Sequence, residues 1–251
     1  MLGLAKGKPK WQWAVSGKHP LAADYFRSGA DDPIYSAFAV WMDDGFAALP
    51  NTPEARHAIC FWRFWVRGAK RGNLLCGLLK ASSDRIGRPY PLLIIGGGSL
   101  NGWEKNWVYL PAVLETIWQQ IEYIASKRFI SLEELAAAIH KIEAPTPEMF
   151  KTIRNREFEA DHGASVNLSD NSSDIINIAE HLKAQKAVIV PLDEQSRADP
   201  SYLPVLWSLQ LQMQGMDLPQ AIFIGGPPEQ QFLMVLTRSL KVMDFVNLWS
   251  M

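Results

Sequence analysis

Three consecutive runs of apolar and aromatic residues constrain the fold of this chain more than any other feature. They span residues 58–67 (AICFWRFWVR), 72–82 (GNLLCGLLKAS) and 89–98 (PYPLLIIGGG), and turn-forming residues at 68–72 and 84–88 separate them. Runs of this length that are rich in aliphatic and aromatic residues, with glycine or proline at their ends, are typical of β-strands. We therefore predict that this part of the chain forms an antiparallel meander.

The tryptophans of this meander are expected to be buried. Trp62 and Trp65 lie three positions apart in the first run. Because side chains alternate between the two faces of a strand, the two indoles are predicted on opposite faces. The chain has 10 tryptophans, and most of them are expected in the core because large aromatic side chains dominate core burial.

Outside the meander, segments with helical and strand periodicity alternate along the chain. The polar stretch from 143 to 172 is rich in proline, serine, asparagine and aspartate and marks a connection or a lobe boundary. The alternation itself favours an α/β fold with a mixed sheet and helices on both faces. The predicted elements are a strand at 11–16, helices at 33–49 and 109–128, a helix opened by the capping pair Ser131 and Glu134, a helix at 173–184, strands at 186–192 and 219–226 around an apolar segment near 203–213, and a last helix at 228–240.

Length, charge and cysteine content limit the classes of protein to consider. The 251 residues, 48% hydrophobic and 20% charged, suffice for one large domain or two smaller lobes. The net charge of −1 does not imply a nucleic acid or an anionic membrane as partner. No signal-peptide core and no run of about 18 apolar residues is found, and Cys60 and Cys76 lack CxxC spacing. We expect a cytoplasmic protein with two reduced thiols and no direct membrane insertion.

Residues suited to catalysis or metal binding are sparse. The five histidines are scattered, and no GxSxG elbow accompanies them. Asp161 and His162 come closest to a metal-binding pair, but adjacent side chains seldom face one ion. The run GGGS at 96–99 follows a predicted strand and would be suited to hold an anion, yet it lacks the phosphate-loop and GxGxxG spacings, so a strand-ending loop is favoured. We predict no catalytic residues, no cofactor and no metal.

The segment SSDRIGRPYPLL, residues 82–93, carries the most informative local pattern. Asp84 at the first position and Gly87 at the fourth fit a type I turn, with Gly87 free to adopt a positive φ. The tip of this hairpin carries Arg85 and Arg88. These arginines either pair with Asp84 and hold the turn, or face an acidic partner as bidentate donors.

Three segments of the chain resemble the sequence blocks of a known family. They are GKHPLAADYF (17–26), GLLKASSDRIGRPYPLLI (77–94) and LPQAIFIGGPPEQQFLMVL (218–236), and they are similar to the blocks of the type VI secretion-associated family TagF, also called ImpM. The second block is the most specific of the three. The third departs from the family pattern, because Trp207 replaces a tryptophan pair and GPP replaces GLP.

The resemblance implies both a fold and a set of site residues. It implies a single α/β domain over 1–251, built as a three-layer α/β/α sandwich with a mixed, partly antiparallel sheet. The family-motif residues, which are also the candidate partner-binding residues, are Lys18, Asp24, Asp84, Arg85, Gly87 and Arg88.

The resemblance also implies a function. It is similar to that of a non-enzymatic cytoplasmic accessory protein of a bacterial type VI secretion system, a post-translational repressor that acts by protein–protein binding. The implied partners are type VI secretion proteins, with the forkhead-associated scaffold protein as a candidate. Two alternatives stay open: a small-molecule or phosphate-binding enzyme that uses the glycine loop at 96–98, and a structural component of the cytoplasmic platform.

Overall fold

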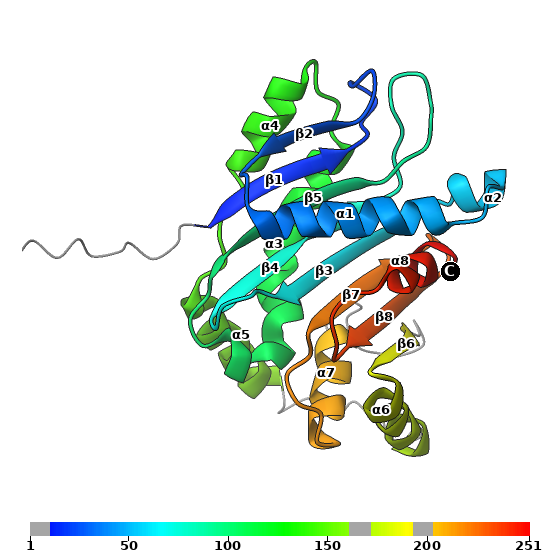
Figure 1. Cartoon of the computed structure of the whole chain (residues 1–251). Coiled ribbons are helices and arrows are strands. Elements are labelled where there is room, and N and C mark those ends of the chain that lie inside the picture. Colours follow the sequence, from blue (N-terminus) through cyan, green and yellow to red (C-terminus); the bar gives the residue numbers. More distant parts are fainter. Residues whose placement is uncertain (1–10, 161–171, 193–202) are drawn as a thin grey trace, which may run out of the picture.

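One eight-stranded sheet forms the centre of the molecule (Figure 1). The computed structural model describes residues 11–160, 172–192 and 203–251. The strand order is β2-β1-β5-β4-β3-β7-β8-β6. The strands are β1 (Gln12–Gly17), β2 (Phe26–Gly29), β3 (Phe61–Arg67), β4 (Asn73–Lys80), β5 (Leu92–Ser99), β6 (Ala187–Leu192), β7 (Ala221–Gly226) and β8 (Gln231–Leu236).

The sheet is antiparallel throughout the described part of the chain. The prediction of a mixed, partly antiparallel sheet is therefore wrong in this respect, whereas the meander β3-β4-β5 is confirmed. The connections between β3 and β4 and between β7 and β8 are short, and short connections impose antiparallel pairing. Strands from both sides of residues 143–172 enter the same sheet.

Helices contribute to buried clusters on both faces of the sheet (Figure 1). Trp62 belongs to one cluster and Trp65 to the other, which confirms that they lie on opposite faces. The first cluster contains residues of α1 (Pro33–Ala48) and α8 (Val242–Trp249). The second contains residues of α3 (Leu110–Ser126), α4 (Leu132–His140), α5 (Pro147–Ala160), α6 (Ser172–Gln185), α7 (Leu203–Met213) and the 3-10 helices η1 (Trp103–Lys105) and η2 (Trp107–Tyr109); α2 (Pro53–Arg56) is short and without buried residues.

Local capping accounts for where two of the predicted helices begin. Asp32 precedes α1, and its Oδ1 accepts a hydrogen bond from the Ile34 amide at 2.9 Å. Ser131 precedes α4, and its Oγ accepts from the Glu134 amide at 3.2 Å. These side chains satisfy amides that the first helical turn leaves without partners, so both starts could be placed from the sequence.

The predicted last helix at 228–240 is wrong. Residues Gln231–Leu236 form β8, which pairs with β7 and β6, and the last helix, α8, begins at Val242. Leu233 faces one buried cluster and Met234 the other, so the run is apolar on both sides. A short apolar run that is buried on both faces has no period that separates a strand from a helix.

The glycine run at 96–98 lies inside β5 and is not a strand-ending loop. Gly96 pairs with Trp13 of β1 and with Cys76 of β4. A Cβ atom at Gly96 would overlap the Trp13 indole, and one at Gly98 would lie 2.7 Å from the Trp11 ring. The glycines therefore let the two indoles lie against the strand, and their backbone belongs to the sheet.

Candidate partner-binding site

The site predicted from the sequence is the hairpin between β4 and β5, with residues 85–87 at its tip (the hairpin tip; the loop at upper right in Figure 1). The Gly87 amide donates to the Asp84 carbonyl at 3.0 Å, and Gly87 has a φ of +83°. The Asp84 Oδ1 accepts from the amides of Ile86 at 3.1 Å and Arg88 at 3.0 Å. The predicted tight turn with glycine at positive φ is confirmed.

The Asp84 carboxylate is the centre of a buried charge network. Its side chain has 0% exposure, and its Oδ2 lies 3.0 Å from the Lys18 Nζ and 2.6 Å from the Arg88 Nε. Burial alone raises the pKa of Asp84, but hydrogen bonds from Lys18, Arg88 and the turn amides outweigh burial and hold that pKa well below its usual range. Two cations from separate segments thus fix the base of the hairpin.

Asp24 extends this network to the surface. The Arg88 Nη2 lies 3.2 Å from the Asp24 Oδ2, and Lys18 lies 3.8 Å from the Asp24 Oδ1. Asp24 is 65% exposed, and a hydrogen bond from the Tyr25 amide, with smaller effects of Arg88 and Lys18, lowers its pKa. The structure therefore brings together Lys18, Asp24, Asp84 and Arg88, four of the six candidate residues.

Arg85 behaves differently from Arg88. Its backbone amide donates to the Ala22 carbonyl at 2.8 Å, but within the described residues its exposed guanidinium has no hydrogen bond or ion pair. Of the two alternatives predicted for the arginines, internal pairing holds for Arg88, and the outward orientation holds for Arg85. Ile86 beside it is 73% exposed and was missed at the sequence level, although its place in the turn puts it at the tip.

Aromatic residues flank the base of the hairpin. The rings of Tyr25 and Tyr90 are 5.8 Å apart at 80°, and the Tyr90 hydroxyl donates to the Asp43 carboxylate of α1. Tyr25 is 43% exposed. The hairpin tip thus carries an exposed aliphatic side chain and an unpaired arginine, and an exposed tyrosine packs on its base; such residues are typical of contact surfaces.

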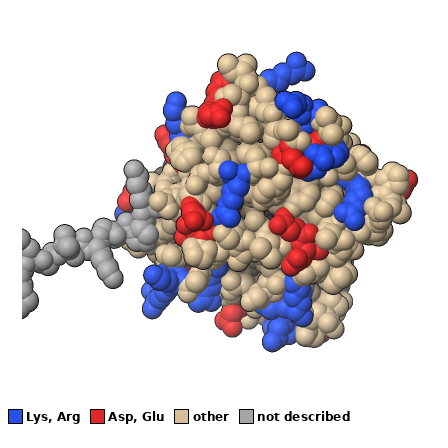
Figure 2. All heavy atoms as spheres, turned by 45° about the horizontal axis from the view of Figure 1, so that its top comes forward, with Lys and Arg blue, Asp and Glu red and all other residues tan. Residues whose placement is uncertain are grey.

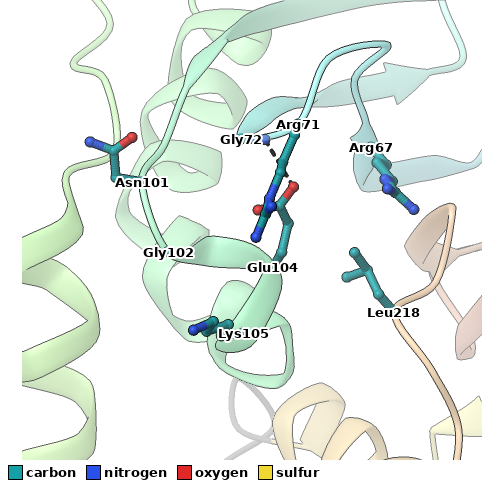
Figure 3. Close-up of a pocket in the computed structure, with 8 residues that line it drawn as sticks. All are labelled: Arg67, Arg71, Gly72, Asn101, Gly102, Glu104, Lys105 and Leu218. Atoms are coloured by element: carbon teal, nitrogen blue, oxygen red, sulfur yellow. Dashed lines mark hydrogen bonds between the residues drawn. The ribbon is translucent and has the colours of Figure 1, made fainter.

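Two hollows lie elsewhere on the described molecule. One has a volume of about 700 Å³ and lies between α3 and the sheet, beside Arg63 and Lys80. The other, of about 490 Å³, lies where β3 ends and β4 begins, beside Arg67, Arg71 and Lys105 (Figure 3).

No group of three or more metal-ligating side chains occurs among residues 11–160, 172–192 and 203–251. Asp161 and His162 lie outside the described residues. In that same described part of the chain, no helix has the length and apolar character that crossing a membrane requires. Cys60 and Cys76 are free and buried, as predicted.

Comparison with known proteins identifies the family. The crystal structure of PA0076 from Pseudomonas aeruginosa PAO1 resembles this chain with a TM-score of 0.55 at 14% sequence identity, covering 94% of this chain and 93% of that one; this likeness concerns the fold. A comparison with curated proteins finds no match. Residues 14–143, just over half of the chain, match the family model described as the TagF N-terminal domain, type VI secretion system-associated. The chain belongs to the TagF family of type VI secretion accessory proteins.

Proposed function

We propose that this protein is a cytoplasmic regulator of a type VI secretion system that represses the machine by binding another of its proteins, with no enzymatic activity of its own. The observation that carries the proposal is the hairpin tip, where Asp84 and Arg88 hold the backbone while Arg85 and Ile86 face outward. In this proposal Arg88 stabilises the hairpin, and Arg85 contacts the partner. The forkhead-associated scaffold protein is the candidate partner.

The charge distribution supports recognition by a small surface and not by a broad field. Figure 2 shows acidic and basic side chains interspersed on the face that includes the top of Figure 1. The formal net charge of the whole chain is −1. A single unpaired arginine beside an exposed isoleucine therefore selects a partner that offers one carboxylate next to an apolar patch.

The alternative of an enzyme that binds a phosphate at a glycine loop is not supported, because Gly96, Gly97 and Gly98 form no loop and pair within β5. A stoichiometric platform component and a repressor differ in two measurable ways. A repressor is present at lower copy number than the sheath and baseplate proteins, and its deletion raises secretion. A platform component matches their copy number, and its deletion abolishes secretion.

Affinity purification of the tagged full-length chain from its native host, under secretion-active conditions, tests the proposal. We expect a type VI component to be co-purified and Arg85→Ala to weaken that complex by about 2 kcal/mol, roughly thirtyfold in Kd, at unchanged Tm. Arg128→Ala removes another exposed arginine, beyond the end of α3, and serves as the matched control. Full retention of the partner by both Arg85→Ala and Ile86→Ser would show that the hairpin tip is not the contact surface.

A further inference from the structure

We propose that the hollow of about 490 Å³ beside Arg67, Arg71 and Lys105 is an anion-binding site for a phosphate group. Arg67 ends β3, Arg71 lies in the β3–β4 turn, and Lys105 ends η1. The hairpin tip lies beyond the opposite end of β4, an eight-residue strand that spans roughly 24 Å. The proposal therefore does not depend on the function proposed for the hairpin.

The cations of this hollow have no anionic partner among the described residues. The ion pairs between described residues include none with Arg67, Arg71 or Lys105. Glu104 is the one acid that lines the hollow, and its Oε1 accepts a hydrogen bond from the Gly72 amide at 2.9 Å. Three positive charges and one negative charge leave a formal charge of about +2 in the hollow.

The two segments that supply these cations are fixed to each other. The Gly72 amide donates to Glu104, and the Gly72 carbonyl accepts from the Leu100 amide at 2.9 Å. Gly72 has a φ of +79°, which a glycine adopts without strain. Figure 3 shows Arg71 directed from the turn toward Glu104, with Arg67 and Leu218 on one side of it and Lys105 on the other. The backbone positions that carry the basic residues are thus fixed before any ligand arrives.

The chemistry of the lining favours a phosphate over a carboxylate or an apolar ligand. Leu218 is the one large apolar side chain that lines the hollow. A phosphate monoester carries a charge of about −1.5 to −2 and three acceptor oxygens, which matches the formal charge of the hollow. Arginine binds such oxygens in bidentate fashion.

An extended polyanion fits less well than a single phosphate. The chain has a formal net charge of −1, and the face in Figure 2 carries both signs of charge. A nucleic acid would need a basic track of many contacts for affinity. The favoured source of the phosphate is therefore a phosphorylated side chain or a small phosphorylated molecule.

The experiment is calorimetric titration of the purified full-length chain with inorganic phosphate at constant ionic strength. We expect saturable binding of one phosphate. Arg71→Gln is expected to weaken it by about tenfold or more, because it removes a positive charge and its bidentate hydrogen bonds. Glu104→Gln is expected to strengthen it, because it removes the negative charge while its amide oxygen still accepts from Gly72. Arg128→Gln, which removes one exposed positive charge at a distant surface, should bind phosphate like the unmodified chain.

Three results would overturn the proposal: no saturable binding up to about 10 mM phosphate, equal weakening by Arg71→Gln and Arg128→Gln, or a DNA oligonucleotide that binds more tightly than phosphate with a steep salt dependence. Two ligands identify the source of the phosphate in the positive case. Tighter binding of a phosphoserine peptide than of adenosine monophosphate assigns the site to a phosphoprotein, and the reverse order assigns it to a small phosphorylated molecule.

Discussion

At the scale of single residues, Asp84 is the side chain on which the hairpin depends. It is fully buried, accepts from two backbone amides, and contacts both Lys18 and Arg88. Its pKa is lowered in the folded protein from the usual value of 3.8, so the folded state holds the proton less tightly than the unfolded chain. The stabilisation is therefore complete above pH 3.8 and is lost as the pH falls below it.

We expect Asp84→Asn to lower the Tm at pH 7 by about 5 °C or more, because two cations lose their buried counter-ion. The variant should also lose less stability than the unmodified chain when the pH is lowered toward 2. Thermal unfolding followed by circular dichroism at several pH values measures both effects. Asp31→Asn, at a 96% exposed side chain, is the control and should leave the Tm unchanged. Equal Tm values for the two variants would contradict the importance of the network.

Gly87 offers a separate test of the turn. Its φ of +83° disfavours any residue with a Cβ atom, yet a Cβ added there meets nothing within 4 Å. Gly87→Ala is therefore expected to cost about 1 kcal/mol through backbone strain alone. At Gly77, where a Cβ would overlap the Ile94 carbonyl oxygen, alanine should cost distinctly more. Urea unfolding of the two variants compares the costs, and equal values would contradict the overlap at Gly77 as the larger of the two costs.

At the scale of elements, one ion-pair cluster ties α3 to the sheet. Arg63 of β3 donates from Nε and Nη2 to the two oxygens of Glu122, at 2.5 and 2.9 Å, and from Nη1 to Glu115 at 2.8 Å. The Arg63 side chain is 21% exposed. Because the geometry toward Glu122 is bidentate and that toward Glu115 is not, the two carboxylates are expected to contribute unequally.

We expect Glu122→Gln to lower the free energy of unfolding by about 2 kcal/mol and Glu115→Gln by about 1 kcal/mol. Arg63→Met should cost more than either, about 3 kcal/mol, because it leaves both carboxylates without a cation. Denaturant unfolding at pH 7 measures all three. A larger loss of unfolding free energy in Glu115→Gln than in Glu122→Gln would show that the bidentate contact is not the stronger one.

Much of the element order could be predicted from the sequence, because its signals are local. Asp32 and Ser131 cap helices within three residues of themselves, and the Asp84 turn closes within four. The contact of Lys18 with Asp84 joins residues far apart in the chain, so turn chemistry could predict the hairpin but not what stabilises its base. The strand β8 could not be predicted for another reason: burial on both faces removes the alternation on which a strand prediction depends.

At the scale of the whole molecule, the sheet joins both parts of the chain. β3, within the residues matched by the family model, pairs with β7 near the other end of the sequence. We therefore expect one cooperative thermal transition in scanning calorimetry, with equal calorimetric and van't Hoff enthalpies. Two resolved transitions would instead place a lobe boundary within residues 143–172. Ligand-free, freshly purified chain is the sample for this measurement.

The pairing of β3 with β7 also affects how the chain folds during synthesis. Val66 pairs with Ala221, so one edge of β3 stays open until the segment around residue 221 has left the ribosome. That edge belongs to a strand with Phe61, Trp62 and Phe64, and an open aromatic edge invites pairing with strands of other chains. We therefore expect overexpression at high temperature to favour inclusion bodies, which comparison of the soluble fraction at two growth temperatures would measure.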